Sequence, residues 1–89
     1  MFSPPSGGGA NPGQWEVEQW TVAVPGETQY TVAMAVALDA DGTPLIRIEY
    51  GGVSYGIGDD FTLADKTITW TCGILLEAGE VLDVWYVQA

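Results

Sequence analysis

Large apolar side chains alternate with small or polar ones, residue by residue, through much of this sequence. The alternation is longest over residues 29–38, where every second position is large and apolar: Tyr30, Val32, Met34, Val36 and Leu38. Because successive side chains of a β-strand point to opposite faces, this two-residue period predicts strands with one buried face. No segment shows a competing helical period, since the helix formers of residues 74–80 are few and end at Ala78-Gly79.

Turn-forming residues divide the chain into short segments of this kind. Proline, glycine and aspartate mark turns at residues 25–28, 39–42, 51–52, 58–59, 64–66 and 78–80. The intervening segments predict strands, the clearest of them at residues 15–24, 29–38, 45–50, 53–55, 67–72 and 81–87. We therefore expect an all-β fold, a small antiparallel β-sandwich or barrel of six or seven short strands with an extended N-terminal arm.

The first of these segments, residues 15–24, changes its pattern midway. Trp15 and Val17 share one parity, whereas the large apolar residues from Trp20 onward share the other. A β-bulge near Glu18-Gln19 would reconcile the two halves, because one extra residue exchanges the faces of a strand. The sequence therefore predicts a bulged first strand.

The N-terminal segment differs in composition from the rest of the chain. Residues 1–14 hold four glycines and three prolines and no charged side chain. Such a segment cannot offset its own ordering entropy, so we expect it to become ordered only against a partner. This divides the chain into an arm at residues 1–14 and a β-sandwich domain at residues 15–89. The candidate partner-binding residues of the arm are Phe2, Pro4, Pro5 and Pro12.

The charge balance excludes some classes of partner. Twelve acidic residues face only Arg47 and Lys66, which gives a formal net charge of −10. A surface of this kind repels phosphate backbones and anionic lipids, so we expect neither nucleic acid nor a membrane as partner. The longest apolar run is also far shorter than the ~20 residues of a membrane span.

The residue inventory argues against catalysis. The chain has no histidine and a single cysteine, Cys72, so the Ser–His and Cys–His forms of nucleophilic catalysis are missing. Cys72 lies on the predicted face of Ile68 and Trp70 without a basic neighbour, which indicates a buried structural thiol. We expect no enzyme activity and no cofactor.

The acidic residues of the turns offer weaker alternatives. Paired carboxylates for glycoside hydrolysis would have to come from turn residues such as Asp59, Asp60, Glu77 and Glu80, in a chain too short to build a cleft around them. Calcium at residues 39–42 or 59–60 is chemically better founded, but neither segment has the spacing of a twelve-residue calcium loop. Solvated turns are therefore the favoured interpretation, with no metal site.

Aromatic residues are the remaining candidates for a binding surface. By their parity, Trp70, Tyr30 and Tyr86 are expected in the core. The surface candidates, which fall on the opposite parity, are Trp85 and either Trp15 or Trp20. An exposed aromatic surface is favoured in protein–protein contacts, although stacking on a glycan stays open as an alternative.

The second half of the chain carries a resemblance. Residues 55–87 contain, in order, the entry Gly58-Asp59-Asp60-Phe61, a short hairpin, the strand Thr67-Ile68-Thr69-Trp70, the turn Ala78-Gly79-Glu80 and a closing strand through Val84-Trp85-Tyr86. This pattern resembles a small β-sandwich module of tailed-bacteriophage virion surface proteins, which occurs in capsid decoration, fibre and baseplate proteins. No motif is recognised in residues 1–29.

The resemblance implies a structural protein of the virion, assembled in the cytoplasm of the bacterial host. The short chain and its single copy of the module favour a capsid decoration (cement) protein over a fibre. Its expected partners are the major capsid protein or other virion proteins, together with copies of itself, with trimers expected from the resemblance alone. The alternative is a tail-fibre or baseplate module that recognises host-surface glycan through exposed tryptophans.

Overall fold

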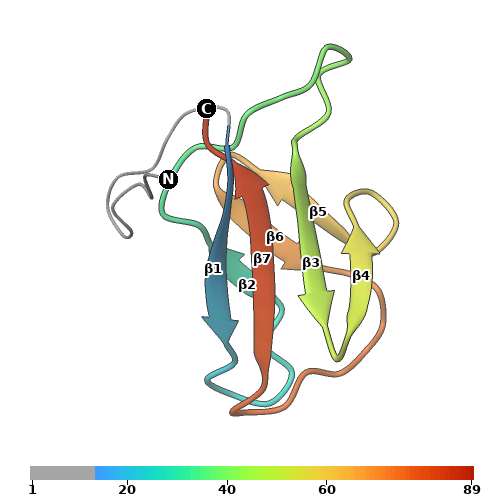
Figure 1. The fold of residues 1–89 in the computed structure, drawn as a ribbon. Helices are drawn as coiled ribbons and strands as arrows, with labels where there is room; N and C mark the ends of the chain where they lie inside the picture. Colours follow the sequence, from blue (N-terminus) through green and yellow to red (C-terminus); the bar gives the residue numbers. More distant parts are fainter. Residues whose placement is uncertain (1–13) are drawn as a thin grey trace.

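Two antiparallel β-sheets face each other in the computed structural model, which describes residues 14–89 (Figure 1). The seven strands are β1 (Trp15–Thr21), β2 (Gln29–Thr31), β3 (Ile46–Tyr50), β4 (Val53–Gly56), β5 (Phe61–Ala64), β6 (Thr67–Trp70) and β7 (Val81–Val87). One sheet has the order β1-β7-β3-β4 and the other the order β2-β6-β5. The all-β, antiparallel prediction is confirmed, and residues 14–89 contain no helix.

The hydrophobic core lies between the two sheets and follows the predicted alternation. In β7 the even-numbered positions Leu82, Val84 and Tyr86 are each at most 1% exposed. The other members of the core cluster are Trp20, Val22, Val32, Ile46, Ile48, Phe61, Ile68, Trp70 and Leu76. Because β7 is bonded to β1 on one side and β3 on the other, it forms the middle of the larger sheet.

The first strand differs from the prediction. It ends at Thr21, and its pairing with β7 runs without interruption from Trp15 opposite Val87 to Thr21 opposite Val81, so the predicted bulge is wrong. The alternation is strict, but two of its inward positions are occupied by glutamates, Glu16 and Glu18, rather than by apolar residues. The prediction assigned inward positions by their apolar residues. Because Glu16 and Glu18 are polar, the first half of the strand was assigned the wrong inward face, and a change of face was predicted before Trp20.

Residues 29–38 also differ from the single strand that their alternation predicts. Only Gln29–Thr31 form a strand, in the smaller sheet, whereas Val36 and Leu38 make isolated bridges to Gln88 and Pro44. Between the two, the amide of Ala33 donates to the Glu18 carboxylate at 2.9 Å instead of to a neighbouring strand. The chain therefore crosses from the smaller sheet to the C-terminal end of β7 in the larger one.

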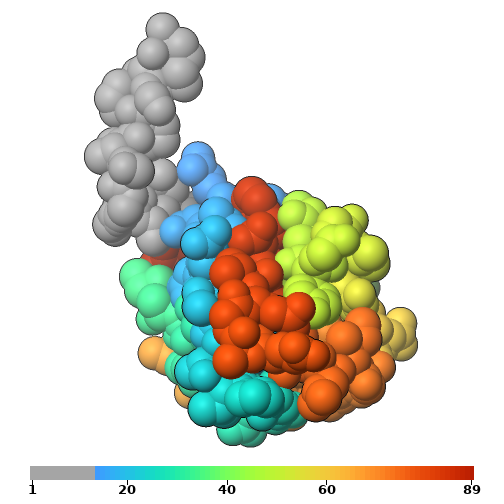
Figure 2. Space-filling view, turned by 90° about the horizontal axis from the view of Figure 1, so that it is seen from below, coloured from blue at the N-terminus to red at the C-terminus, as the bar shows by residue number. Residues whose placement is uncertain are grey.

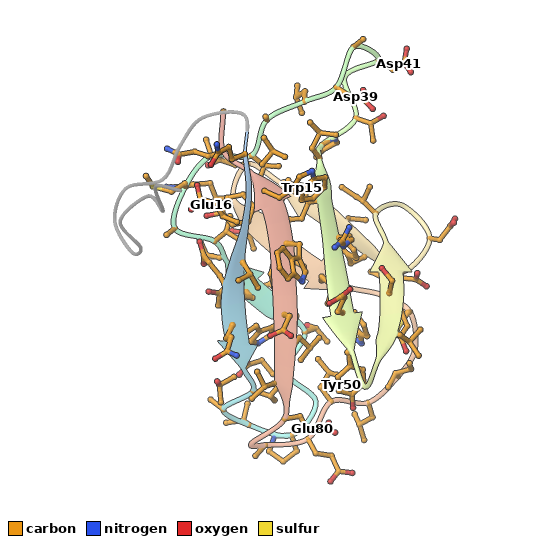
Figure 3. All side chains as sticks on the ribbon, viewed as in Figure 1. Trp15, Glu16, Asp39, Asp41, Tyr50 and Glu80 are labelled. Atoms are coloured by element: carbon orange, nitrogen blue, oxygen red, sulfur yellow. The ribbon has the colours of Figure 1, made fainter. Side chains whose placement is uncertain are left out.

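The turns lie close to where the sequence places them. Gly51 and Gly52 have φ angles of 62° and 81°, a left-handed conformation that glycine adopts without steric cost in a two-residue hairpin. The Asp39 carboxylate closes the loop of residues 39–43 by accepting hydrogen bonds from the amides of Asp41 (2.8 Å) and Thr43 (3.0 Å). Both aspartates lie at the tip of this projecting loop (Figure 3).

The segment that joins β6 to β7 is irregular, as predicted for residues 74–80. Figure 2, which views the molecule from below, shows residues 22–28 (cyan) and 74–80 (orange) side by side. The amide of Gly26 donates to the Leu76 carbonyl at 2.7 Å between these two segments. Cys72 is half-buried against the core rather than fully enclosed. Among residues 14–89, no helix is long or apolar enough to cross a membrane.

Candidate functional site

The outer face of the four-stranded sheet carries an aromatic patch, which consists of Trp15, Val17, Arg47 and Trp85. Three adjacent strands place it, because Trp85 of β7 lies opposite Val17 of β1 on one side and opposite Arg47 of β3 on the other. Trp15 and Val17 are each 47% exposed, and Trp85 is half-buried. Figure 3 shows Trp15 on the larger sheet, near the end of the sandwich that holds the Asp39 loop.

The guanidinium of Arg47 holds the patch together. Its central carbon lies 5.4 Å from the ring centroid of Trp15 and 5.4 Å from that of Trp85. Since β1 and β3 flank β7 at about 9–10 Å from each other, the side chains of Trp15 and Arg47 can only meet above β7. Val87, which pairs with Trp15, is accordingly 5% exposed although it belongs to the outer face.

Glu49 completes this arrangement. The indole N–H of Trp85 donates to Glu49 Oε1 at 3.1 Å, and Glu49 Oε2 lies 3.9 Å from the Arg47 guanidinium. An exposed ion pair of this length contributes about 0–1 kcal/mol, and a cation–π contact at an exposed site about 0.5–1 kcal/mol. These contacts orient the two indoles and contribute little to the stability of the whole domain.

The three tryptophans that were predicted as surface candidates differ in their exposure. Trp15 and Trp85 do lie together on the outer face. Trp20 is not a surface residue: it is 1% exposed, stacks on Tyr30 at 5.7 Å and meets Trp70 edge to face at 6.5 Å. Its inward position follows from the unbroken register of β1, which also gives Trp15 its outward one.

The other predicted contact residues cannot be compared in this way. Phe2, Pro4, Pro5 and Pro12 lie outside the described residues 14–89. Two residues that contact the patch tryptophans, Arg47 and Glu49, were not among the predicted contact residues. Only the pairing of β3 with β7 brings them to Trp85.

A second polar cluster lies on the inner face of the same sheet. The Glu18 carboxylate accepts hydrogen bonds from the hydroxyls of Tyr30 (2.7 Å) and Tyr86, in addition to the amide of Ala33. Every bond reaches it from a different segment, so the carboxylate joins both sheets and the connection between them. An inward-pointing charge on an edge strand also discourages pairing with another chain along that edge.

Glu16, two residues earlier, occupies an inward position of the same strand. Its Oε2 is buried and has no hydrogen-bond partner, and the same is true of Gln88 Oε1. Among residues 14–89, no group of three or more cysteine and acidic side chains is placed to hold a metal ion. The carboxylates of the Asp39 loop bond to their own backbone instead.

The Glu18 cluster predicts a loss of stability at high pH. Burial, and then the hydrogen bond to Glu18, raise the pKa of Tyr30 from 10 to about 12, and the same causes raise the pKa of Tyr86. Because both pKa values are higher in the folded state, this contribution is complete below pH 10 and is lost as the pH rises from 10 to about 12. Urea unfolding measured across this range checks it.

The variant Tyr30→Phe is the control for the alkaline transition. It removes one of the two tyrosines bonded to Glu18, so the stability of this variant should fall less steeply between pH 10 and about 12. An equally steep fall in both proteins would assign the transition to groups other than Tyr30.

Comparison with known proteins adds no assignment. No family model, no curated protein and no solved structure matches this chain.

Proposed function

We propose that this protein is a structural component of a bacteriophage virion, a capsid decoration protein that attaches through the aromatic patch and the N-terminal segment. The observation that carries the proposal is the position of the patch. Trp15 is both its most exposed indole and the first residue of β1, so the patch begins directly after the N-terminal segment in the sequence. The two candidate contact elements are thus adjacent along the chain.

The chemistry of the patch supports contact with protein. Tryptophan and arginine are the residues that most often dominate protein–protein binding energy, and three of the four patch residues are of these types. Strongly acidic chains also approach basic surfaces readily, and the net charge of −10 favours such a partner. The resemblance of residues 55–87 to phage virion modules supplies the setting, with the major capsid protein as the expected partner.

Glycan recognition is less well supported. Sugars stack on the open face of an aromatic ring, but the Arg47 guanidinium lies over both Trp15 and Trp85 at 5.4 Å. No catalytic constellation emerges from the described residues that would favour an enzyme. Attachment to protein is therefore the function we carry forward.

Capsid binding tests the proposal. Undecorated capsids of the phage that encodes the chain are mixed with the purified protein and sedimented. We expect the wild-type chain to sediment with them, and Trp15→Ala to weaken binding at least tenfold, because a hot-spot residue contributes about 2 kcal/mol or more. The control is Leu75→Ala, which removes the most exposed large hydrophobic side chain at the opposite end of the domain, 69% exposed.

Two outcomes would overturn the proposal. One is a wild-type chain that stays in the supernatant with capsids present. The other is binding to host polysaccharide that Trp85→Ala abolishes while capsid binding is absent, which would establish the glycan alternative.

A further inference from the structure

A second exposed apolar surface lies at the end of the sandwich opposite the Asp39 loop. This apolar end consists of Val24, Pro25, Ile74 and Leu75. Val24 is 56% exposed and Leu75 69%, the largest exposed fraction among the large hydrophobic side chains of residues 14–89. Figure 2 shows the two segments that contribute these residues side by side. The apolar end therefore belongs to neither the core nor the aromatic patch.

Hydrogen bonds between the two segments hold the apolar end in place. The Val22 amide donates to the Glu80 carbonyl at 2.8 Å, and the Val22 carbonyl accepts from the Gly79 amide at 2.8 Å. A Cβ atom at Gly26 would lie 3.7 Å from Cδ1 of Leu75, so this leucine lies against the opposite segment although most of its side chain is exposed. A surface fixed in this way loses little conformational entropy when it binds a partner.

Three carboxylates accompany these apolar residues. The Trp20 indole donates to Glu27 at 2.6 Å, and the Glu77 amide donates to Glu80 at 2.8 Å. These hydrogen bonds lower the pKa of both carboxyls, because they favour the charged form. The third carboxylate, that of Glu77, belongs to an exposed residue. Neither segment contains a lysine or an arginine, so both contribute only negative charge.

We propose that the apolar end binds a protein segment in which apolar side chains are flanked by lysine or arginine. The apolar part of such a segment covers Leu75 and Val24, and its cations pair with the carboxylates beside them. This contact goes beyond attachment through the aromatic patch, because it lies at the other end of the domain. The domain then joins two partners, one at each end.

Charge selects such a segment over a second copy of this chain. A second copy also has a net charge of −10, and its cations are Arg47 and Lys66. The guanidinium of Arg47 is already held over the rings of Trp15 and Trp85. Two copies that met at the apolar end would place carboxylates against carboxylates, whereas a basic segment meets complementary charge. The same repulsion disfavours phosphate backbones and anionic lipids.

A short synthetic peptide, in which two central leucines are flanked by lysines, tests this contact. It is titrated into the full-length protein, labelled with ¹⁵N, while the amide chemical shifts are followed. A companion peptide with serines in place of the leucines measures the effect of charge alone. The matched control variant is Leu38→Ser, because Leu38 is also 59% exposed and directly precedes Asp39 at the other end of the domain.

We expect the leucine peptide to shift the amide signals of residues 22–28 and 74–80. The serine peptide, and the variant Leu75→Ser with the leucine peptide, should each bind at least tenfold more weakly, because a leucine side chain then stays unburied. Glu77→Gln should also weaken binding, with a smaller effect at high salt. It leaves the bond of Glu77 to Glu80 intact, because that bond uses the backbone amide.

Three outcomes would overturn the inference: no binding of the leucine peptide, equal binding of the serine peptide, or equal weakening by Leu38→Ser and Leu75→Ser. Shifts spread evenly over the acidic surface would also contradict it, since they would show attraction by net charge alone. The proposed function is decided separately, because capsid sedimentation depends on Trp15 and uses a Leu75 variant as its control.

Discussion

Replacing Trp20 with alanine is expected to lower the free energy of unfolding by about 3–5 kcal/mol, the usual cost of truncating a buried aromatic residue. The indole is 1% exposed and packs between Tyr30 and Trp70, so its removal leaves a cavity between the sheets. Its N–H also donates to Glu27 at 2.6 Å, a bond that lowers the pKa of that carboxyl. Urea unfolding, followed by circular dichroism, measures the loss.

Trp15→Ala is the matched control, since it truncates the same side chain on the same strand but on the outer face. Trp15 is 47% exposed, so we expect a loss below about 1 kcal/mol, as for most surface substitutions. Trp20→Phe keeps most of the packing and should fall between the two. Equal destabilisation by Trp20→Ala and Trp15→Ala would contradict the division of β1 into an inner and an outer face.

Replacing Glu18 with alanine is expected to cost about 2–4 kcal/mol, because unsatisfied buried donors each cost about 1–3 kcal/mol. The change removes the acceptor of the Tyr30 and Tyr86 hydroxyls and of the Ala33 amide. Tyr86 is 1% exposed, so water does not readily replace the lost partner. Glu18→Gln, which keeps one acceptor oxygen, should cost about half as much.

The variant Glu16→Ala tests whether Glu18→Ala destabilises the protein through its lost hydrogen bonds or merely by removing a charge from the inner face of β1. Glu16 occupies the same face of the same strand, but its Oε2 has no hydrogen-bond partner. Because this Oε2 is buried without a partner, we expect the removal of Glu16 to leave the free energy of unfolding unchanged or to raise it. If Glu16→Ala destabilised the protein as strongly as Glu18→Ala, the hydrogen bonds of Glu18 would not be the cause.

Sequence reasoning failed in β1 and in residues 29–38 for related reasons. In β1 it assumed that inward positions are apolar, so the change of parity between Val17 and Trp20 predicted a bulge. In residues 29–38 it assumed that an unbroken alternation means an unbroken strand. Both assumptions ignore that a side chain such as Glu18 can serve as the partner of backbone and hydroxyl groups from other segments.

The aromatic patch was predictable only in part. Parity offered Trp85 together with either Trp15 or Trp20, and the choice between the latter two depends on whether the strand is bulged. The register of β1 against β7 makes that choice. The contribution of Arg47 could not be predicted from the sequence, because it depends on β3 lying beside β7, although β4, β5 and β6 lie between them along the chain.

The amino-acid sequence by itself determined the class of fold, the positions of most turns and the apolar faces of β3, β6 and β7. These follow from local rules, since alternation and glycine or proline placement act within a few residues. The tertiary structure alone decided which strands are neighbours, where the chain changes sheets, and which tryptophans share a surface. Those outcomes depend on contacts between segments that are distant in sequence. The free energies of such contacts cannot be inferred from a local pattern of residues.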